Sequence, residues 1–339
     1  MQAIQRTSMI FILLLISSGS SWAGFYEGFE YFEAGQYQQA LEEFRPLAEE
    51  GNAFAQLYLG IMYDKGYGVP RDHGEAVKWW RLSAEQGGAV AQYNLGDMYA
   101  QGRGVPVNDR EAVKMYRLAA NSGLADAQFS LARMYASGRG IRQNDKVAAY
   151  WYRKAAEQDN AQAQLTLGTL YDDGRGIAQD YKQAAYWYLR AAQQGDATAQ
   201  YNLGSLYANG QGVPQDHAQA VIWYRKAAEQ GNATAQYNLG IAYDNGQGVI
   251  QDKQQAARWY RRAAEQGLAD AQYNLAIMYH EGQGVSRDDV QAYKWFSIVA
   301  AGGGNDARLG RDTIARAMSP AQVSEGQRLA REWQRQHMR

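Results

Sequence analysis

Residues 196–231 read DATAQYNLGSLYANGQGVPQDHAQAVIWYRKAAEQG, and close copies of this stretch follow one another at a spacing of 36 residues. The tryptophan near its end marks the spacing most clearly. Its column, meaning the residues at one position in successive copies, reads Trp79, Met115, Trp151, Trp187, Trp223, Trp259 and Trp295. A period of about 20–50 residues is typical of stacked repeat arrays, so most of the chain is predicted to be one such array.

Three more columns keep the same spacing. The glutamine column is Gln56, Gln92, Gln128, Gln164, Gln200, Gln236 and Gln272. The tyrosine column is Tyr63, Tyr99, Tyr135, Tyr171, Tyr207, Tyr243 and Tyr279. The glycine column is Gly66, Gly102, Gly138, Gly174, Gly210, Gly246 and Gly282. Columns that keep the same 36-residue spacing through seven copies predict a solenoid, in which each unit buries its apolar surface against its neighbours.

The first half of a copy predicts a helix. Ala199, Leu203 and Leu206 lie at i, i+4 and i+7, which is one face of a helix. Gly204 has no side chain, so a neighbouring element can approach closely there. Gly210 then stands where a helix can end in a residue with positive φ.

The second half predicts another helix after a glycine-containing loop. Asp216 is placed to cap its N-terminus, and Gly231 to end it. Its buried face is predicted to consist of Ala220, Trp223, Ala227 and Ala228. Truncation of such a buried tryptophan to alanine costs about 3–5 kcal/mol.

The first 23 residues have the chemistry of a secretory signal peptide. Arg6 supplies positive charge, residues 9–16 are unbroken apolar, and Ser21 and Ala23 are the small residues that signal peptidase requires. The apolar run is short beside the roughly 20 residues that span a bilayer, which disfavours a retained anchor. The chain has no Cys, which excludes a lipid anchor on cysteine. We expect an exported protein, periplasmic or secreted, without membrane insertion after cleavage.

Both ends of the array predict caps. Ser319 and Pro320 form the start of a last helix that runs through Trp333. We expect four parts, namely a signal peptide (1–23), an N-terminal capping helical pair (24–51), seven 36-residue repeats (52–303) and C-terminal capping helices (304–339).

The composition argues against nucleic acid as a partner. The formal charge is −1, whereas nucleic-acid binding requires a basic face. Hydrophobic residues make up 46% and charged residues 20%, as in an ordinary soluble globular chain.

The repeated motif Ala-Gln-Tyr-Asn-Leu-Gly, then Tyr, Gly-x-Gly-Val-Pro-x-Asp and Ala-x-x-Trp-Tyr-x-x-Ala-Ala-x-Gln-Gly resembles the Sel1-like repeat, a relative of the tetratricopeptide repeat. The resemblance implies an all-α, right-handed α/α superhelical solenoid with a concave inner surface, and a role as an adaptor or assembly scaffold. The departures from the motif are Met115 for Trp, Ala132 and Ala276 for Gly, Asn108 and Asn144 for the capping Asp, and Asp159 for the closing Gly. Asp159 is the costliest, because a residue with a side chain is strained at positive φ.

Motifs for catalysis or metal binding are not found in the sequence. The histidines are His73, His217, His280 and His337, and they form no His-Glu-x-x-His. Ser-x-x-Lys, Gly-x-Ser-x-Gly and the Gly-x-x-x-x-Gly-Lys phosphate loop do not occur either. The periodic aspartates are expected to cap helices. We therefore expect no enzyme activity, no cofactor and no metal.

Two alternatives to a protein-binding scaffold remain at this point. One is an accessory protein related to polysaccharide or peptidoglycan. The other, less favoured, is a hydrolase that interacts with penicillin, since a cysteine-rich branch of the family is associated with that activity. This chain lacks the two cysteines per repeat of that branch.

The first candidate surface is a stripe on the first helix of each repeat, where the residue type varies between copies. Its asparagines can donate to and accept from a peptide backbone, while isoleucines offer apolar contact. The resemblance places this stripe on the concave face, and we expect it to bind a protein or peptide partner. Alternatively, the asparagines bond neighbouring parts of the chain. The residues are Asn94, Arg133, Asn202, Asn238, Ile241, Asn274 and Ile277.

The second candidate surface is the loop edge. Arg103, Arg139 and Arg175 share one column, which continues as glutamine in later copies. Stacked guanidinium groups would bind an anionic partner or an envelope polysaccharide. The alternative is a row of solvated charges with no partner.

Overall fold

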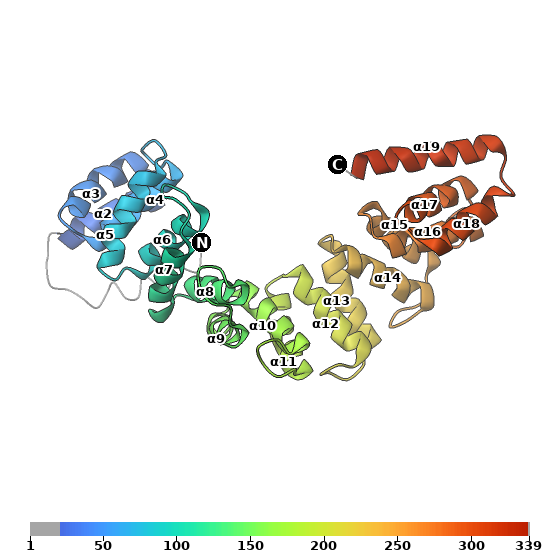
Figure 1. Ribbon diagram of the computed structural model, residues 1–339, viewed down its shortest axis with the longest axis horizontal. Helices are drawn as coiled ribbons and strands as arrows, with labels where there is room; N and C mark the ends of the chain where they lie inside the picture. Colours follow the sequence, from blue (N-terminus) through green and yellow to red (C-terminus); the bar gives the residue numbers. More distant parts are fainter. Residues whose placement is uncertain (1–20, 338–339) are drawn as a thin grey trace. The chain divides into compact units, whose positions relative to one another are not determined.

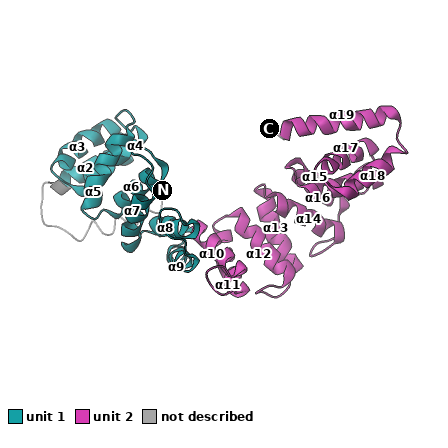
Figure 2. Cartoon of the chain, viewed as in Figure 1, with its two compact units in different colours: residues 1–160 teal, residues 161–339 magenta. Residues whose placement is uncertain are grey.

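The computed structural model describes residues 21–337, and within this range the regular elements are all α-helices (Figure 1). The chain divides into two compact units, residues 1–160 (unit 1) and 161–339 (unit 2), coloured separately in Figure 2. Each unit is a row of helix pairs in which each helix packs on the next along the chain, except that α19 packs on α17. The prediction of an all-α solenoid is confirmed.

The helices of unit 1 are α2 (Ser21–Glu33), α3 (Tyr37–Glu49), α4 (Ala53–Lys65), α5 (His73–Glu85), α6 (Ala89–Gln101), α7 (Asp109–Asn121), α8 (Ala125–Ser137) and α9 (Asp145–Ala156). Those of unit 2 are α10 (Ala161–Asp173), α11 (Tyr181–Gln193), α12 (Ala197–Asn209), α13 (His217–Glu229), α14 (Ala233–Asn245), α15 (Lys253–Glu265), α16 (Ala269–Glu281), α17 (Asp289–Ala301), α18 (Asn305–Ala315) and α19 (Pro320–His337). In each repeat we call the first helix A and the second helix B.

The signal-peptide prediction falls mostly on residues 1–20, which lie outside the described residues. Residues 21–23 form the first turn of α2. None of the helices in the described range is both long and apolar enough to cross a membrane.

The ends of the helices form as the motif predicts. Gly210 ends α12 with φ 68°, and its amide donates to the carbonyl of Leu206. The carboxylate of Asp216 accepts from the amide of Gln219 and so caps α13. The second loop glycine is needed for space as well, because a Cβ on Gly212 would lie 2.2 Å from the backbone of Tyr181 in the preceding repeat.

The glutamine column joins each repeat to the preceding one. Gln200 is 4% exposed, and its amide nitrogen donates to the carbonyl of Ala192 in the last turn of the previous helix B, at 3.1 Å. The oxygen of the same amide accepts from Gln230 at 2.8 Å. The carbonyl of Ala192 also accepts from the backbone amide of Gly195 at 3.1 Å, so the glutamine links helix A to the C-terminal turn of the preceding repeat.

Trp223 is predicted to lie on the buried face of its helix with Ala220, Ala227 and Ala228; the three alanines are buried, whereas Trp223 is not. The next residue, Tyr224, is the buried one, and its ring lies over Gly204, where a Cβ would come within 2.8 Å of the ring. Trp223 is only partly buried and packs against the core that helix B of the preceding repeat forms with helix A of its own repeat. Adjacent helix positions differ by about 100° in direction, so one aromatic side chain fills its own repeat and the other covers the seam.

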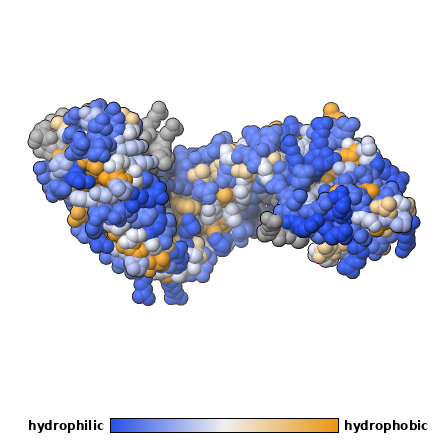
Figure 3. Space-filling view, turned by 90° about the horizontal axis from the view of Figure 1, so that it is seen from above, coloured by the Kyte–Doolittle hydropathy of each residue, from blue (hydrophilic) through white to orange (hydrophobic). Residues whose placement is uncertain are grey.

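Both ends of the array carry additional helices. At the N-terminal end, Phe25 and Phe44 pack with Tyr58 of the first repeat. At the C-terminal end, α18 and α19 both pack on α17, and Trp333 meets Trp295 edge to face with ring centroids 5.9 Å apart. The face shown in Figure 3 is largely hydrophilic with small apolar patches, as expected for an array whose terminal cores are covered.

Truncation of the tryptophan and truncation of the tyrosine that follows it are predicted to lower the stability of the fold by different amounts. Tyr260 is 1% exposed, whereas its neighbour Trp259 is only partly buried. We expect Tyr260→Ala to lower the free energy of unfolding by about 3–5 kcal/mol and Trp259→Ala by less. Urea denaturation followed by circular dichroism measures both. An equal or larger loss in Trp259→Ala would contradict the assignment of the deeper column.

The strained turn after α9 predicts a stabilising substitution. Asp159 has φ 62°, while the equivalent Gly195 and Gly231 have φ 95° and 92°. Because a side chain is disfavoured in the left-handed region, Asp159→Gly should raise the free energy of unfolding by about 1 kcal/mol. Gly231→Asp is the matched reverse change and should be destabilising. A lower unfolding midpoint for Asp159→Gly would show that the turn is not strained.

Candidate partner-binding site

The varied stripe on the A helices of unit 1 borders a cavity of about 690 Å³, which we call the unit 1 hollow. Helices α6 and α8 form its walls, and tyrosines from the B helices α7 and α9 line it further in. Its lining includes Tyr93, Asp97, Tyr116, Phe129, Ser130, Arg133, Ser137, Arg139 and Tyr152. Of the residues expected to bind a partner, the structure places Arg133 here.

Asp97 is the partly buried carboxylate of the unit 1 hollow. The hydroxyl of Tyr116 donates to its carboxylate at 2.6 Å. Burial raises the pKa of Asp97, and the hydrogen bond from Tyr116 partly opposes this shift. Burial together with the same hydrogen bond raises the pKa of the Tyr116 hydroxyl, so this pair holds its proton on the tyrosine. Burial also raises the pKa of Tyr93 to about 12.

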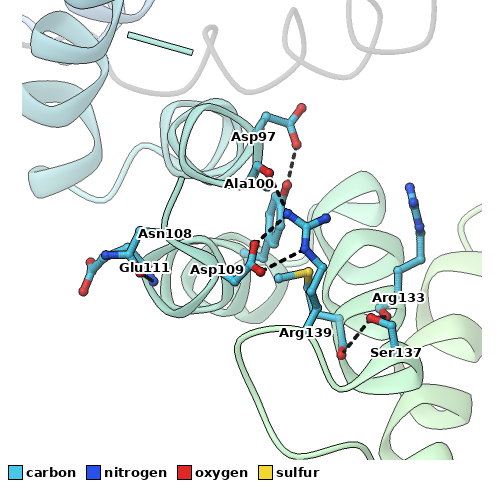
Figure 4. A network of polar contacts seen from close by, with 10 residues as sticks. Asp97, Ala100, Asn108, Asp109, Glu111, Arg133, Ser137 and Arg139 are labelled. Atoms are coloured by element: carbon cyan, nitrogen blue, oxygen red, sulfur yellow. Dashed lines mark hydrogen bonds and ion pairs between the residues drawn. The ribbon is translucent and has the colours of Figure 1, made fainter. Parts of the chain in front are cut away.

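The two arginines of the unit 1 hollow differ in availability. Arg139 is held in place, since its guanidinium donates to both oxygens of Asp109 at 3.0 and 2.6 Å and to the carbonyl of Ala100 at 2.6 Å (Figure 4). Arg133 is exposed and lies apart from that network, with its guanidinium 5.9 Å from the centroid of the Phe129 ring. Arg133 is therefore the cation that can meet a partner without breaking an ion pair.

Unit 2 has a hollow at the equivalent repeat position, and its chemistry is different. The unit 2 hollow has a volume of about 340 Å³ and brings two predicted residues, Asn238 and Ile241, into one lining. The rest of that lining includes Ser205, Ala208, Asn209, His217, Tyr224 and Gln247. Its side chains are amides, hydroxyls and apolar groups, with His217 as the one titratable group beside Tyr224.

Two predicted asparagines also contact tyrosines of their own unit. Burial raises the pKa of Tyr224 to about 12, while hydrogen bonds from Ser205 and Asn238 act in the opposite direction. Asn274 likewise hydrogen-bonds the hydroxyls of Tyr237 and Tyr260. Part of the hydrogen-bonding capacity of these amides is thus used within the chain, as the alternative interpretation held.

The other residues of the stripe lie apart from the two hollows. Asn94, Asn202 and Ile277 are partly buried, and Ile277 packs against the C-terminal core. The binding role of the whole stripe stays a prediction.

The arginine column on the loop edge does not consist of free charges. Arg103 forms an ion pair with the buried carboxylate of Asp64 at 3.3 Å, which Lys65 and His73 also approach. Arg139 is paired with Asp109, as described above. Arg175 is exposed. Two of the three arginines thus neutralise an aspartate of the preceding repeat, which weakens the case for an anionic partner at this edge.

Groups of His, Asp and Glu suited to hold a metal ion are not present among residues 21–337. The functional residues that the sequence-based prediction missed are Asp97 and Tyr116. A signal existed for Asp97, because its column otherwise holds Ile61, Arg133, Thr169, Ser205, Ile241 and Ile277, so that it is the one carboxylate there.

Comparison with known proteins agrees with this architecture. The family model described as Sel1 repeat matches residues 53–88, 89–124, 125–160, 161–196, 197–232, 233–268 and 269–304. The solved structure of a Sel1 repeat protein from Oxalobacter formigenes is 36% identical, covers 71% of this chain and 96% of its own, and superposes with a TM-score of 0.61. A protective antigen with an SLR fold from uropathogenic Escherichia coli is 31% identical over 94% of this chain and 92% of its own, with a TM-score of 0.36.

The partly buried carboxyl of Asp97 predicts a pH-dependent change in stability. Because its pKa is raised on folding, folding favours the protonated form, and this contribution is lost as the pH rises through the folded-state pKa. Asp97→Asn mimics the neutral form and can still accept from Tyr116. The variant should therefore melt above the wild type at pH 7, and the difference should vanish below about pH 4.

Thermal melts at the two pH values test this expectation. Glu157→Gln is the control, since Glu157 is an exposed carboxylate of the same unit. A variant that melts below the wild type at pH 7, or a difference that does not depend on pH, would contradict the burial argument.

Proposed function

Because the chain belongs to the Sel1 repeat family, whose members generally act as non-catalytic scaffolds for protein–protein interaction, we propose that it is a scaffold or adaptor of the bacterial cell envelope. It binds a segment of a partner protein along the varied stripe of its A helices. It works in the periplasm or outside the cell, without a cofactor.

One observation carries this proposal. The columns that join the repeats keep the same residue types from copy to copy, whereas the column that faces the two hollows changes from Asp97 and Arg133 in unit 1 to Ser205 and Ile241 in unit 2. Changes at these positions leave the helix-to-helix contacts intact. Such a surface can be specific for one partner sequence, because each hollow offers its own charge and polarity.

The proposed location is supported by residues 1–23. A short positive region, eight apolar residues and small residues at Ser21 and Ala23 are the pattern of an exported chain. The near-neutral formal charge gives no reason to expect nucleic acid as a partner.

Capture of the partner in living cells tests the proposal. The full chain with a C-terminal tag is crosslinked in intact cells of its host, the periplasmic and secreted fractions are separated, and the captured proteins are identified. The same experiment is run with Arg133→Gln and with the triple variant Asn202→Ala, Asn238→Ala, Asn274→Ala. Arg142→Gln, which removes an exposed arginine from a nearby loop, is the control.

We expect one dominant partner in the periplasmic or secreted fraction. Arg133→Gln or the triple variant should reduce its capture at least tenfold, and the control should not. Melting curves must show that the variants are folded, because Asn238 and Asn274 also bond tyrosines. Equal capture by all forms would contradict binding at this stripe. Recovery of envelope polysaccharide without any protein would contradict the scaffold function and favour the alternative of a glycan-related accessory protein.

A further inference from the structure

The second repeat departs from the other six where its helix B meets the preceding repeat. Elsewhere the tryptophan column covers this seam. Trp151 packs against the core around Leu131, Trp223 against the core around Leu203, and Trp259 against the core around Leu239. In the second repeat the column holds Met115, which packs in the same manner against the core around Leu95.

A cavity of about 480 Å³ accompanies this replacement. It lies in unit 1 between α5, α6 and α7, away from the residues that line the unit 1 hollow. Its wall is formed by Ala84, Gly87, the buried Gln92, Leu95, Met115 and Leu118, and its rim by Arg81, Glu85, Tyr99, Glu111 and Lys114. A flexible thioether has replaced a rigid bicyclic ring, and the space beside it is open to solvent.

A second replacement in the same helix makes the cavity more apolar. In the fifth and sixth repeats a cation one turn after the tryptophan lies over the indole. The ammonium of Lys226 is 4.2 Å from the ring centroid of Trp223, and the guanidinium of Arg262 is 4.7 Å from that of Trp259. The equivalent residue in the second repeat is Leu118, which is 42% exposed. The repeat thus lacks both the indole and its cation, and presents an exposed leucine instead.

Two pairs of polar side chains at the rim are partnered with each other. Arg81 donates to the hydroxyl of Tyr99 at 3.2 Å, and Lys114 lies 3.6 Å from the carboxylate of Glu111. The floor of the cavity is apolar and consists of Leu95, Met115 and Leu118. The buried side-chain oxygen of Gln92 has no hydrogen-bond partner and can accept from one N–H group. This combination suits an indole, which has a large apolar body and a single donor.

We propose that this cavity binds an aromatic side chain of a partner protein, a tryptophan above all, in the place that other repeats fill with their own tryptophan. The argument is one of equivalence between repeats, because the same backbone frame encloses an indole at Trp223 and Trp259. Met115 adds a polarisable sulfur that favours contact with aromatic rings. The site goes beyond the proposed binding stripe and depends on the scaffold function only for the protein nature of its partner.

The test uses N-acetyltryptophanamide as the probe and needs no partner, so its outcome is independent of the capture experiment. The full chain is labelled with ¹³C at the methionine methyl groups and titrated with the probe. We expect a saturable shift of the Met115 signal, while the signal of Met278, buried in unit 2, stays in place. N-acetylleucinamide is the ligand control and should bind at least tenfold more weakly.

Two variants test the assignment of the site. In both, binding is measured by NMR saturation transfer from the protein to the probe, because Met115→Trp removes the Met115 signal. Met115→Trp fills the cavity from within, so binding of the probe should be lost while the melting temperature is kept or raised. The double variant Trp223→Met, Lys226→Leu reproduces the second repeat in unit 2 and should add a second binding site. The proposal is overturned if Met115 shows no saturable shift, if Met115→Trp still binds the probe, or if the leucine analogue binds equally well.

Discussion

The buried glutamine of each helix A sets the distance between one repeat and the next. In unit 2, Gln200, Gln236 and Gln272 donate to the carbonyls of Ala192, Ala228 and Ala264 at 3.1, 3.0 and 3.0 Å. These amides are at most 4% exposed, and a buried polar group left without its partner costs about 1–3 kcal/mol. The stacking distance can therefore change little. The close approach of Gly212 to Tyr181 of the preceding repeat requires that distance.

The columns that join the repeats form a constant frame, and residues outside that frame can vary from copy to copy. The charged and polar groups of the two hollows lie at these variable positions. The unit 1 hollow combines a partly buried carboxylate at Asp97 with an exposed cation at Arg133. The unit 2 hollow has neutral amides and apolar groups at the same place in the repeat. The cavity beside Met115 arises differently, because there a position of the frame itself has changed. Specificity in such an array comes both from positions that vary freely and from single departures in the frame.

Much of the fold could be predicted from the period of 36 residues, since spacing alone identifies the helices, the glycine turns and the caps such as Asp216. The relative depth of Trp223 and Tyr224 could not, because two adjacent aromatic residues satisfy the same pattern and only the stacking geometry separates them. For the site, the sequence identified Asn238, Ile241 and Arg133. It did not identify the pairing of Arg139 with Asp109, because residues 30 apart meet only after the repeats have stacked.

The central claim is that the varied stripe on the A helices, and not the exposed face of the B helices, contacts the partner. The most direct measurement is photo-crosslinking in living cells from a single photoreactive residue, placed in turn at Arg133, at Ile241 and at the exposed Lys146 of α9. The account predicts the same crosslinked partner from one or both A-helix positions and none from Lys146. A partner crosslinked only from Lys146, or equally from all three positions, would contradict it.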